Sequence, residues 1–151
     1  MPASSSAEDK ARILDAGRVV EFGFLSYDEY STILSGADIF LFPFQNQPLN
    51  TGRWPNKIGD YMAAGRPTIS NRTGDLVELF QKHRIGLLAS DDPEDVAAKT
   101  FQLLSDEQLA KEMGITARKT AEKYYDWKLL ARKLESCFSE VLSVAKDKDD
   151  I

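Results

Sequence analysis

The chain has 151 residues, of which 42% are hydrophobic and 28% charged, and its net charge is -5. This length suits one domain with a single core, and the composition is that of a soluble globular protein rather than a disordered one. The basic residues are dispersed, so no basic stripe can displace counterions from phosphates, and the charge argues against a nucleic-acid partner.

Residues that bind metals or react covalently are scarce. Cys137 is the single cysteine and His83 the single histidine. A metal site needs more His, Cys or clustered carboxylates than this, so we predict no metal site and no cofactor. Cys137 falls in an amphipathic segment, where we expect it to pack as a small hydrophobe. The sequence shows neither a signal peptide nor an apolar stretch of membrane length, which predicts a cytoplasmic chain.

The N-terminal third begins with a predicted helix and a predicted strand. Helical spacing of small and apolar residues predicts a helix over 7–16. The β-branched and aromatic content of 19–24, Val-Val-Glu-Phe-Gly-Phe, predicts a strand. Ser26 then caps a helix that runs to about Ser35, and Glu29 completes a capping box.

The central segment reads as strand, loop, helix and strand. Residues 39–42 are apolar at every position, as expected of a strand that is covered on both faces. A polar loop follows over 43–55, and a loop this long inside a compact domain is usually functional. We expect a short helix at 56–64, ended by Gly65, and a strand at 67–70.

Strands and helices continue to alternate toward the C-terminus. The remaining elements are predicted in this order: a helix at 75–83, a strand at 86–89, a helix that opens at Asp92 and Pro93, and helices at about 106–122 and 127–146. Ala97, Phe101 and Leu104 are predicted to form the inner face of the helix that opens at Asp92. This alternation predicts an α/β fold with a parallel sheet.

The residues around the central helix suggest an anion site. Helices that follow strands in such sheets point their N-termini at the carboxyl edge, where ligands bind. The Thr51-Gly52 pair of the loop would let backbone N–H groups approach a phosphate. Lys57 lies in the first turn, where a cation is unfavourable unless an anion sits opposite it. Asp60 could accept hydrogen bonds from two ribose hydroxyls. Alternatively, Asp60 is an exposed acid that stands early in the helix because it interacts favourably with the helix dipole, and the spacing alone favours neither interpretation.

The last predicted helix carries a broad apolar stripe. Asp126 is a good N-cap for it. The stripe consists of Trp127, Leu130, Leu134, Cys137, Phe138, Val141 and Leu142.

Several ordered motifs resemble one enzyme family. The run GDYMAAGRPTI is similar to a segment of retaining glycosyltransferases of the GT-B fold, family four, also called group 1 glycosyltransferases. The flanking runs VVEFGFLSYDEYSTILSGADIFLFPF and RIGLLASDDPEDVAAKTFQLLSD, and the later ARKTAEKYYDW, resemble the family's motifs in the same order. The resemblance covers about 18–142. It implies the Rossmann-like, doubly wound parallel sheet of the family's C-terminal domain, with extra C-terminal helices.

The resemblance also implies a reaction and a donor site. Members move a sugar from a nucleotide-diphosphate sugar to an acceptor hydroxyl and retain the anomeric configuration. Asp60 matches the second of two family acids, which contacts the ribose, and Lys57 could reach the diphosphate or the sugar. The first acid falls on Gly52, so the longer loop would have to supply another group, with Asn46, Gln47 and Asn50 as candidates. No catalytic residue, base, sugar or acceptor is identified.

The resemblance is incomplete in a way that bears on activity. Only the third to sixth strands of the family's C-terminal domain have counterparts, so we expect a tail at 1–6, a partial Rossmann-like nucleotide-sugar-binding domain at 7–146 and a charged tail at 147–151. The expected partners are the nucleotide-diphosphate sugar, the missing N-terminal acceptor-binding domain and a second copy of the chain. The chain alone should not catalyse transfer. A non-catalytic Rossmann-like binding or assembly module is the alternative, and membrane association through parts outside this sequence is left open.

Overall fold

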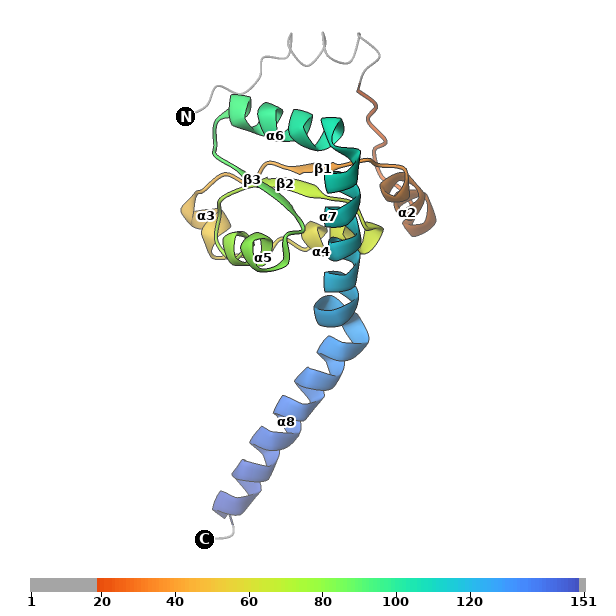
Figure 1. The fold of residues 1–151 in the computed structure, drawn as a ribbon. Coiled ribbons are helices and arrows are strands. Elements are labelled where there is room, and N and C mark those ends of the chain that lie inside the picture. Colours follow the sequence, from red (N-terminus) through yellow and green to blue (C-terminus); the bar gives the residue numbers. More distant parts are fainter. Residues whose placement is uncertain (1–18, 150–151) are drawn as a thin grey trace. The chain divides into compact units, whose positions relative to one another are not determined.

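The computed structural model describes residues 19–149, with side chains as far as Leu142 (Figure 1). Contacts divide the chain into two compact units, Met1–Thr32 and Ile33–Ile151, which are treated separately below. The helix predicted at 7–16 lies outside the described residues, and so does the predicted tail at 1–6. The predicted domain boundaries stay predictions.

The strand predicted at 19–24 is wrong. These residues carry no regular secondary structure, and Val20 and Phe22 are exposed. Local β-propensity alone does not make a strand, because the backbone must also find a neighbour to pair with. The described strands pair only with one another.

The capping box at Ser26 is confirmed. The Ser26 backbone N–H and hydroxyl donate to the Glu29 carboxylate at 2.8 and 2.7 Å, and the Glu29 N–H donates back to the Ser26 hydroxyl at 3.4 Å. The side-chain hydrogen bond from Ser26, followed by the backbone one, lowers the pKa of Glu29. The capped helix, α2, spans Tyr27–Ser35.

Three parallel strands form the sheet, in the order β1-β2-β3. They are β1 (Phe40–Phe42), β2 (Thr68–Asn71) and β3 (Gly86–Ala89), each within one residue of its predicted range. Phe40 pairs with Thr68, which pairs with Gly86. Every residue of the central strand β2 is buried, so the α/β class with a parallel sheet is confirmed.

Helices make up most of the remainder. They are α3 (Pro48–Thr51), α4 (Lys57–Ala64), α5 (Leu76–His83), α6 (Pro93–Ser105), α7 (Glu107–Thr120), the π-helix η1 (Ala121–Tyr125) and α8 (Trp127–Asp149). The sequence predicted only loop where α3 forms, although Pro48 at its start has the φ that a first helical turn needs. None of the described helices is both long enough and apolar enough to cross a membrane.

Two hydrophobic clusters hold the sheet between its helices. The first joins α4, α5 and the α7–η1 end, with Ile58, Met62 and Phe80 among its buried members. The second joins β2 and β3 to α6 and α7 through Ile69 and Leu103. In Figure 1, α6 accordingly lies on the opposite side of the sheet from α4 and α5, and α7 runs past both layers.

The inner face predicted for α6 is wrong by one residue. Ala97, Phe101 and Leu104 are exposed, whereas Leu103 is buried and Val96 packs against the second cluster. Both sets of residues recur with the same helical spacing, so the sequence offered two stripes about 100° apart. Packing on the sheet selects the stripe that contains Val96 and Leu103.

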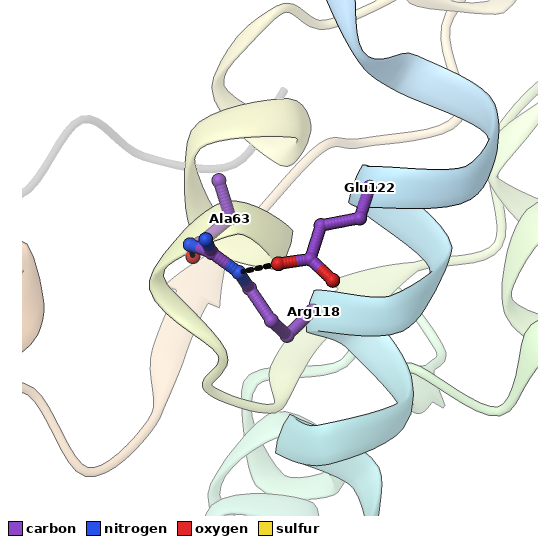
Figure 2. A network of polar contacts seen from close by, with 3 residues as sticks. All are labelled: Ala63, Arg118 and Glu122. Atoms are coloured by element: carbon purple, nitrogen blue, oxygen red, sulfur yellow. Dashed lines mark hydrogen bonds and ion pairs between the residues drawn. The ribbon is translucent and has the colours of Figure 1, made fainter.

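Helix α4 is fixed at its C-terminal end by α7. Gly65 ends α4 in the left-handed conformation (φ 70°), which glycine adopts without strain. A Cβ on Gly114 of α7 would lie 2.3 Å from the Gly65 carbonyl oxygen, so the two backbones touch. Arg118 donates to the Ala63 carbonyl and, at 2.6 Å, to Glu122 (Figure 2). A cation therefore satisfies one of the carbonyls that a helix C-terminus leaves unpaired.

Candidate functional site

The carboxyl ends of the three strands are joined by one buried side chain. Asn71, the last residue of β2, accepts a hydrogen bond from the Phe44 N–H at 2.8 Å through Oδ1. Its Nδ2 donates to the Ser90 carbonyl at 2.7 Å. Phe44 and Ser90 follow β1 and β3, so Asn71 sets the spacing of both loops that leave this edge of the sheet.

The turn after β2 fixes the loop that follows β1. The Thr73 hydroxyl, also buried, donates to the Phe44 carbonyl at 2.6 Å. Gly74 has φ 48°, and a Cβ there would lie 2.7 Å from the Thr51 carbonyl oxygen. A side chain at Gly74 would push the loop away, so glycine is required at this contact.

The predicted loop residues are placed by hydrogen bonds within the loop itself. The Thr51 N–H and hydroxyl both donate to the Gln47 carbonyl at 2.9 Å, and the hydroxyl is 3.4 Å from Asn46 Oδ1. Asn50 Nδ2 donates to the Gln45 carbonyl, and Asn50 Oδ1 accepts from Arg53. These contacts bring Asn46, Asn50 and Thr51 together on the α3 turn.

Gly52 follows α3 with a negative φ of -91°, and a Cβ there would meet nothing within 4 Å. Glycine is therefore not required at position 52 by the loop's own packing. A phosphate contact by the Thr51-Gly52 backbone stays a prediction.

Helix α4 presents Lys57 and Asp60 to solvent. Ile58 and Met62 are fully buried and anchor the helix on the sheet, whereas Lys57 and Asp60, one turn apart, are exposed. Because β1 and β2 are parallel, α4 returns against them and begins at the carboxyl edge. The positive end of its dipole and the Lys57 ammonium therefore lie at the edge that Asn71 organises.

The ring of Tyr61 connects α4 to the sheet. It stacks on Phe40 with centroids 4.1 Å apart and meets the edge of Phe42 at 6.2 Å. Burial, and then the neighbouring Asp60 charge, raise the pKa of Tyr61. Since Tyr61 holds the backbone beside Asp60 against β1, the acid is carried by a well-anchored turn.

The segment before α4 rests on aromatic contacts. Trp54 stacks on Tyr125 of η1 with centroids 5.4 Å apart and planes 10° apart. The Arg53 guanidinium lies over the Phe44 ring at 5.1 Å. These contacts fix the start of α4. Short π-helical segments such as η1 occur frequently at functional sites.

Six residues were predicted for the site, and the structure places them in two groups. Asn46, Asn50, Thr51 and Gly52 lie on the loop after β1, and Lys57 and Asp60 lie on α4. Asn71 and Thr73 were not among the predicted residues. Their signal was present, because polar residues that directly follow a buried strand in a parallel sheet stand at the ligand-binding edge.

A hollow of about 600 Å³ opens at the other end of the strands. Asp38 and Ile39, which precede β1, and Arg66 and Pro67, which precede β2, are among its lining residues. None of the six predicted site residues lines it. It is therefore separate from the edge at which α4 begins.

Known proteins that resemble this chain agree with the fold. The family model described as glycosyl transferases group 1 matches residues 2–106, and the chain belongs to that family. A curated relative, N-acetyl-alpha-D-glucosaminyl L-malate synthase of Bacillus anthracis, is 33% identical over 82 residues, which are 54% of this chain and 22% of that enzyme.

Two solved structures share the architecture. Sucrose-phosphate synthase of Thermosynechococcus elongatus superposes with a TM-score of 0.77 at 20% identity, over 95% of this chain and 37% of its own. HepE of Anabaena, solved in complex with UDP, superposes with a TM-score of 0.69 at 17% identity, over 88% of this chain and 35% of its own. The predicted resemblance to GT-B glycosyltransferases, with the C-terminal-domain fold, is confirmed. The chain spans about a fifth to two fifths of the length of these proteins.

Proposed function

We propose that this chain is the donor-nucleotide-binding part of a glycosyltransferase that moves a sugar from a nucleotide-diphosphate sugar to an acceptor hydroxyl with retention. The observation that carries the proposal is the position of Lys57 and Asp60, exposed at the start of a helix that opens at the carboxyl edge of a parallel sheet. Membership of the group 1 family supports the reaction class. The UDP bound to HepE supports a nucleotide diphosphate as the ligand class.

The proposed roles follow from charge and position. Lys57 and the positive end of the α4 dipole stabilise the charge of the diphosphate, which is the leaving group of the transfer. Asp60, one turn further along, accepts hydrogen bonds from the ribose hydroxyls and fixes the nucleoside. Asn71 and Thr73 position the loop that borders this surface, and Asn46, Asn50, Thr51 and Gly52 lie on that loop. The acceptor site lies outside this chain, and the isolated chain is inactive.

Saturation-transfer NMR with UDP, GDP and ADP tests the proposal directly, because it detects weak binding to the 151-residue chain. We expect one of these nucleotides to show transfer, strongest at the ribose protons. Asp60→Ala should weaken its binding by about 1–3 kcal/mol, the value of a charge-assisted hydrogen bond. Glu94→Ala is the matched control, since Glu94 is an exposed acid in the first turn of α6. Equal losses in both variants, or no transfer with any of the three nucleotides, would contradict the proposal.

One observation favours a second candidate. Gly52 stands where the family pattern has its first acid, and a Cβ built there would meet nothing within 4 Å. A non-catalytic Rossmann-like module for binding or assembly would need no such acid. Nucleotide binding that is indifferent to Asp60→Ala and Lys57→Ala would favour this reading.

A further inference from the structure

Two anchors hold the loop that runs from β1 to α4. At its start, the buried Thr73 hydroxyl donates to the Phe44 carbonyl at 2.6 Å. At its end, Trp54 stacks on Tyr125 of η1 with ring centroids 5.4 Å apart and planes 10° apart. The loop residues of the proposed donor site therefore lie between a hydrogen-bonded anchor and an aromatic one.

The aromatic anchor stands directly before the first turn of α4. Pro55, which follows Trp54, is buried, and its carbonyl accepts a hydrogen bond from the Ile58 N–H at 3.1 Å. Asn56, the N-cap residue, makes no side-chain capping hydrogen bond. Because no side-chain cap fixes this helix end, its position depends on the packing of the residues around it. Lys57 begins the helix three positions after Trp54.

Tyr125 is well held on its own side of the stack. It is the last residue of η1 and packs against the first hydrophobic cluster. Burial, followed by the charges of Glu78 and Asp75, raises the pKa of Tyr125. Glu78 stands in the first turn of α5 and Asp75 at its N-cap, which places the phenol near the start of α5. Trp54 therefore stacks on a ring that two helices hold in place.

Consecutive tyrosines of η1 contact different parts of the domain. Tyr124 meets the His83 ring, at the C-terminal end of α5, with centroids 5.1 Å apart. Tyr125 meets Trp54. Both contacts pair a tyrosine with another ring, but only the second reaches the loop before α4. Tyr124 is therefore a matched control for Tyr125 within the same helical turn.

We propose that Tyr125, acting through Trp54, is a positioning residue of the donor site, an inference that rests on the proposed function. The stack holds the first turn of α4 in the arrangement that keeps the Lys57 ammonium where the diphosphate binds, and Tyr125 does so without touching the nucleotide. Without the stack the loop samples other positions, and the apparent affinity falls with the population that remains competent to bind. Loss of an aromatic pair lowers such a population by up to about tenfold.

Tryptophan fluorescence tests the stack itself, without any nucleotide. Trp54 and Trp127 are the two tryptophans of the chain, and Trp127 is 83% exposed. In a Trp127→Phe chain the emission therefore reports on Trp54 alone. Tyr125→Ala in this background should shift the emission to the red, because the indole gains contact with water. Emission that is the same with and without the Tyr125 ring would show that the stack does not hold in solution and would overturn the proposal.

Titration with a nucleotide diphosphate, followed by NMR, measures the effect on binding. The probe is whichever of UDP, GDP and ADP gives saturation transfer, and each variant is measured well below its own unfolding transition. Tyr125→Ala and Trp54→Ala should each raise the dissociation constant by about tenfold. Tyr125→Phe keeps the ring and should stay within about twofold of the unmodified chain. Tyr124→Ala is the control and should leave the dissociation constant unchanged.

A double-mutant cycle shows whether Tyr125 acts through Lys57. In a Lys57→Ala chain, Tyr125→Ala should add little further loss, because the group that it positions is already gone. Additive losses would overturn the assignment, and so would binding that Lys57→Ala weakens and Tyr125→Ala does not. If none of the three nucleotides bound the unmodified chain, the proposed function itself would fail, and the assignment of Tyr125 with it.

Discussion

At the scale of single residues, polar groups at the carboxyl edge have a structural role. Asn71 is 3% exposed and uses both ends of its amide, one on the Phe44 N–H and one on the Ser90 carbonyl. A buried polar group of this kind is stabilising only while each atom is paired. The positions of the loops after β1 and after β3 therefore both depend on the Asn71 side chain.

Asn71→Ala tests this dependence. The substitution leaves the buried Phe44 N–H without its partner and removes the bond to the Ser90 carbonyl, and we expect a loss of about 2–4 kcal/mol in the free energy of unfolding. Urea denaturation followed by circular dichroism measures it. Asn46→Ala is the control, because Asn46 is exposed and its side-chain contact to Thr51 is long at 3.4 Å. A loss below that of the control variant would show that the Asn71 bonds contribute nothing net.

The site could be predicted from the sequence only as far as local rules reach. Lys57 and Asp60 were predicted because a lysine and an acid at the start of a helix have an electrostatic meaning without any neighbour. Their role in binding stays a prediction. Asn71 and Thr73 were missed because their role depends on two loops that are distant in sequence. The position of the loop that contains α3 likewise depends on Gly74, because its backbone touches Thr51 only in the folded chain.

At the scale of secondary-structure elements, the crossing of α4 and α7 is set by two glycines. The Gly114 Cα faces the Gly65 carbonyl so closely that a Cβ would overlap it at 2.3 Å. We expect Gly114→Ala to force the helices apart and to cost about 1–3 kcal/mol, although alanine is the better helix former.

Thermal unfolding of Gly114→Ala and Gly59→Ala separates the overlap of the two helices from the gain in helix propensity. Gly59 lies inside α4, and a Cβ there would meet nothing within 4 Å. Gly59→Ala should therefore stabilise the chain by up to about 1 kcal/mol. Two variants that shift the melting temperature in the same direction would contradict the proposed close crossing.

The fold could be predicted where one local pattern had one interpretation. The strands at 39–42, 67–70 and 86–89 were found because a short apolar run between turn signals fits a buried strand of a parallel sheet. The strand at 19–24 failed because pairing depends on a neighbour that local propensity does not contain. The inner face of α6 failed because Phe101 and Leu103 belong to two stripes of equal spacing, and only packing on the sheet distinguishes them.

At the scale of the whole molecule, both hydrophobic clusters of the described residues lie after α2. Among those residues Ile39 is the first that packs against either cluster, and Val19, Val20, Phe22 and Phe24 are all exposed. The unit Ile33–Ile151 therefore contains both clusters and all three described strands. Its stability should not depend on the exposed apolar side chains of 19–24.

Replacement of Val20, Phe22 and Phe24 by serine tests this independence and leaves the Ser26 cap of α2 in place. We expect the triple variant to unfold cooperatively with a midpoint in urea equal to that of the unmodified chain, because the replaced side chains belong to neither described cluster. We also expect it to be more soluble, since three exposed apolar side chains are lost. Ile69→Ser, in the second cluster, is the comparison, and it should lower the midpoint strongly. A triple variant that lost cooperative unfolding would show that the segment before α2 completes the fold, in contradiction to the core described above.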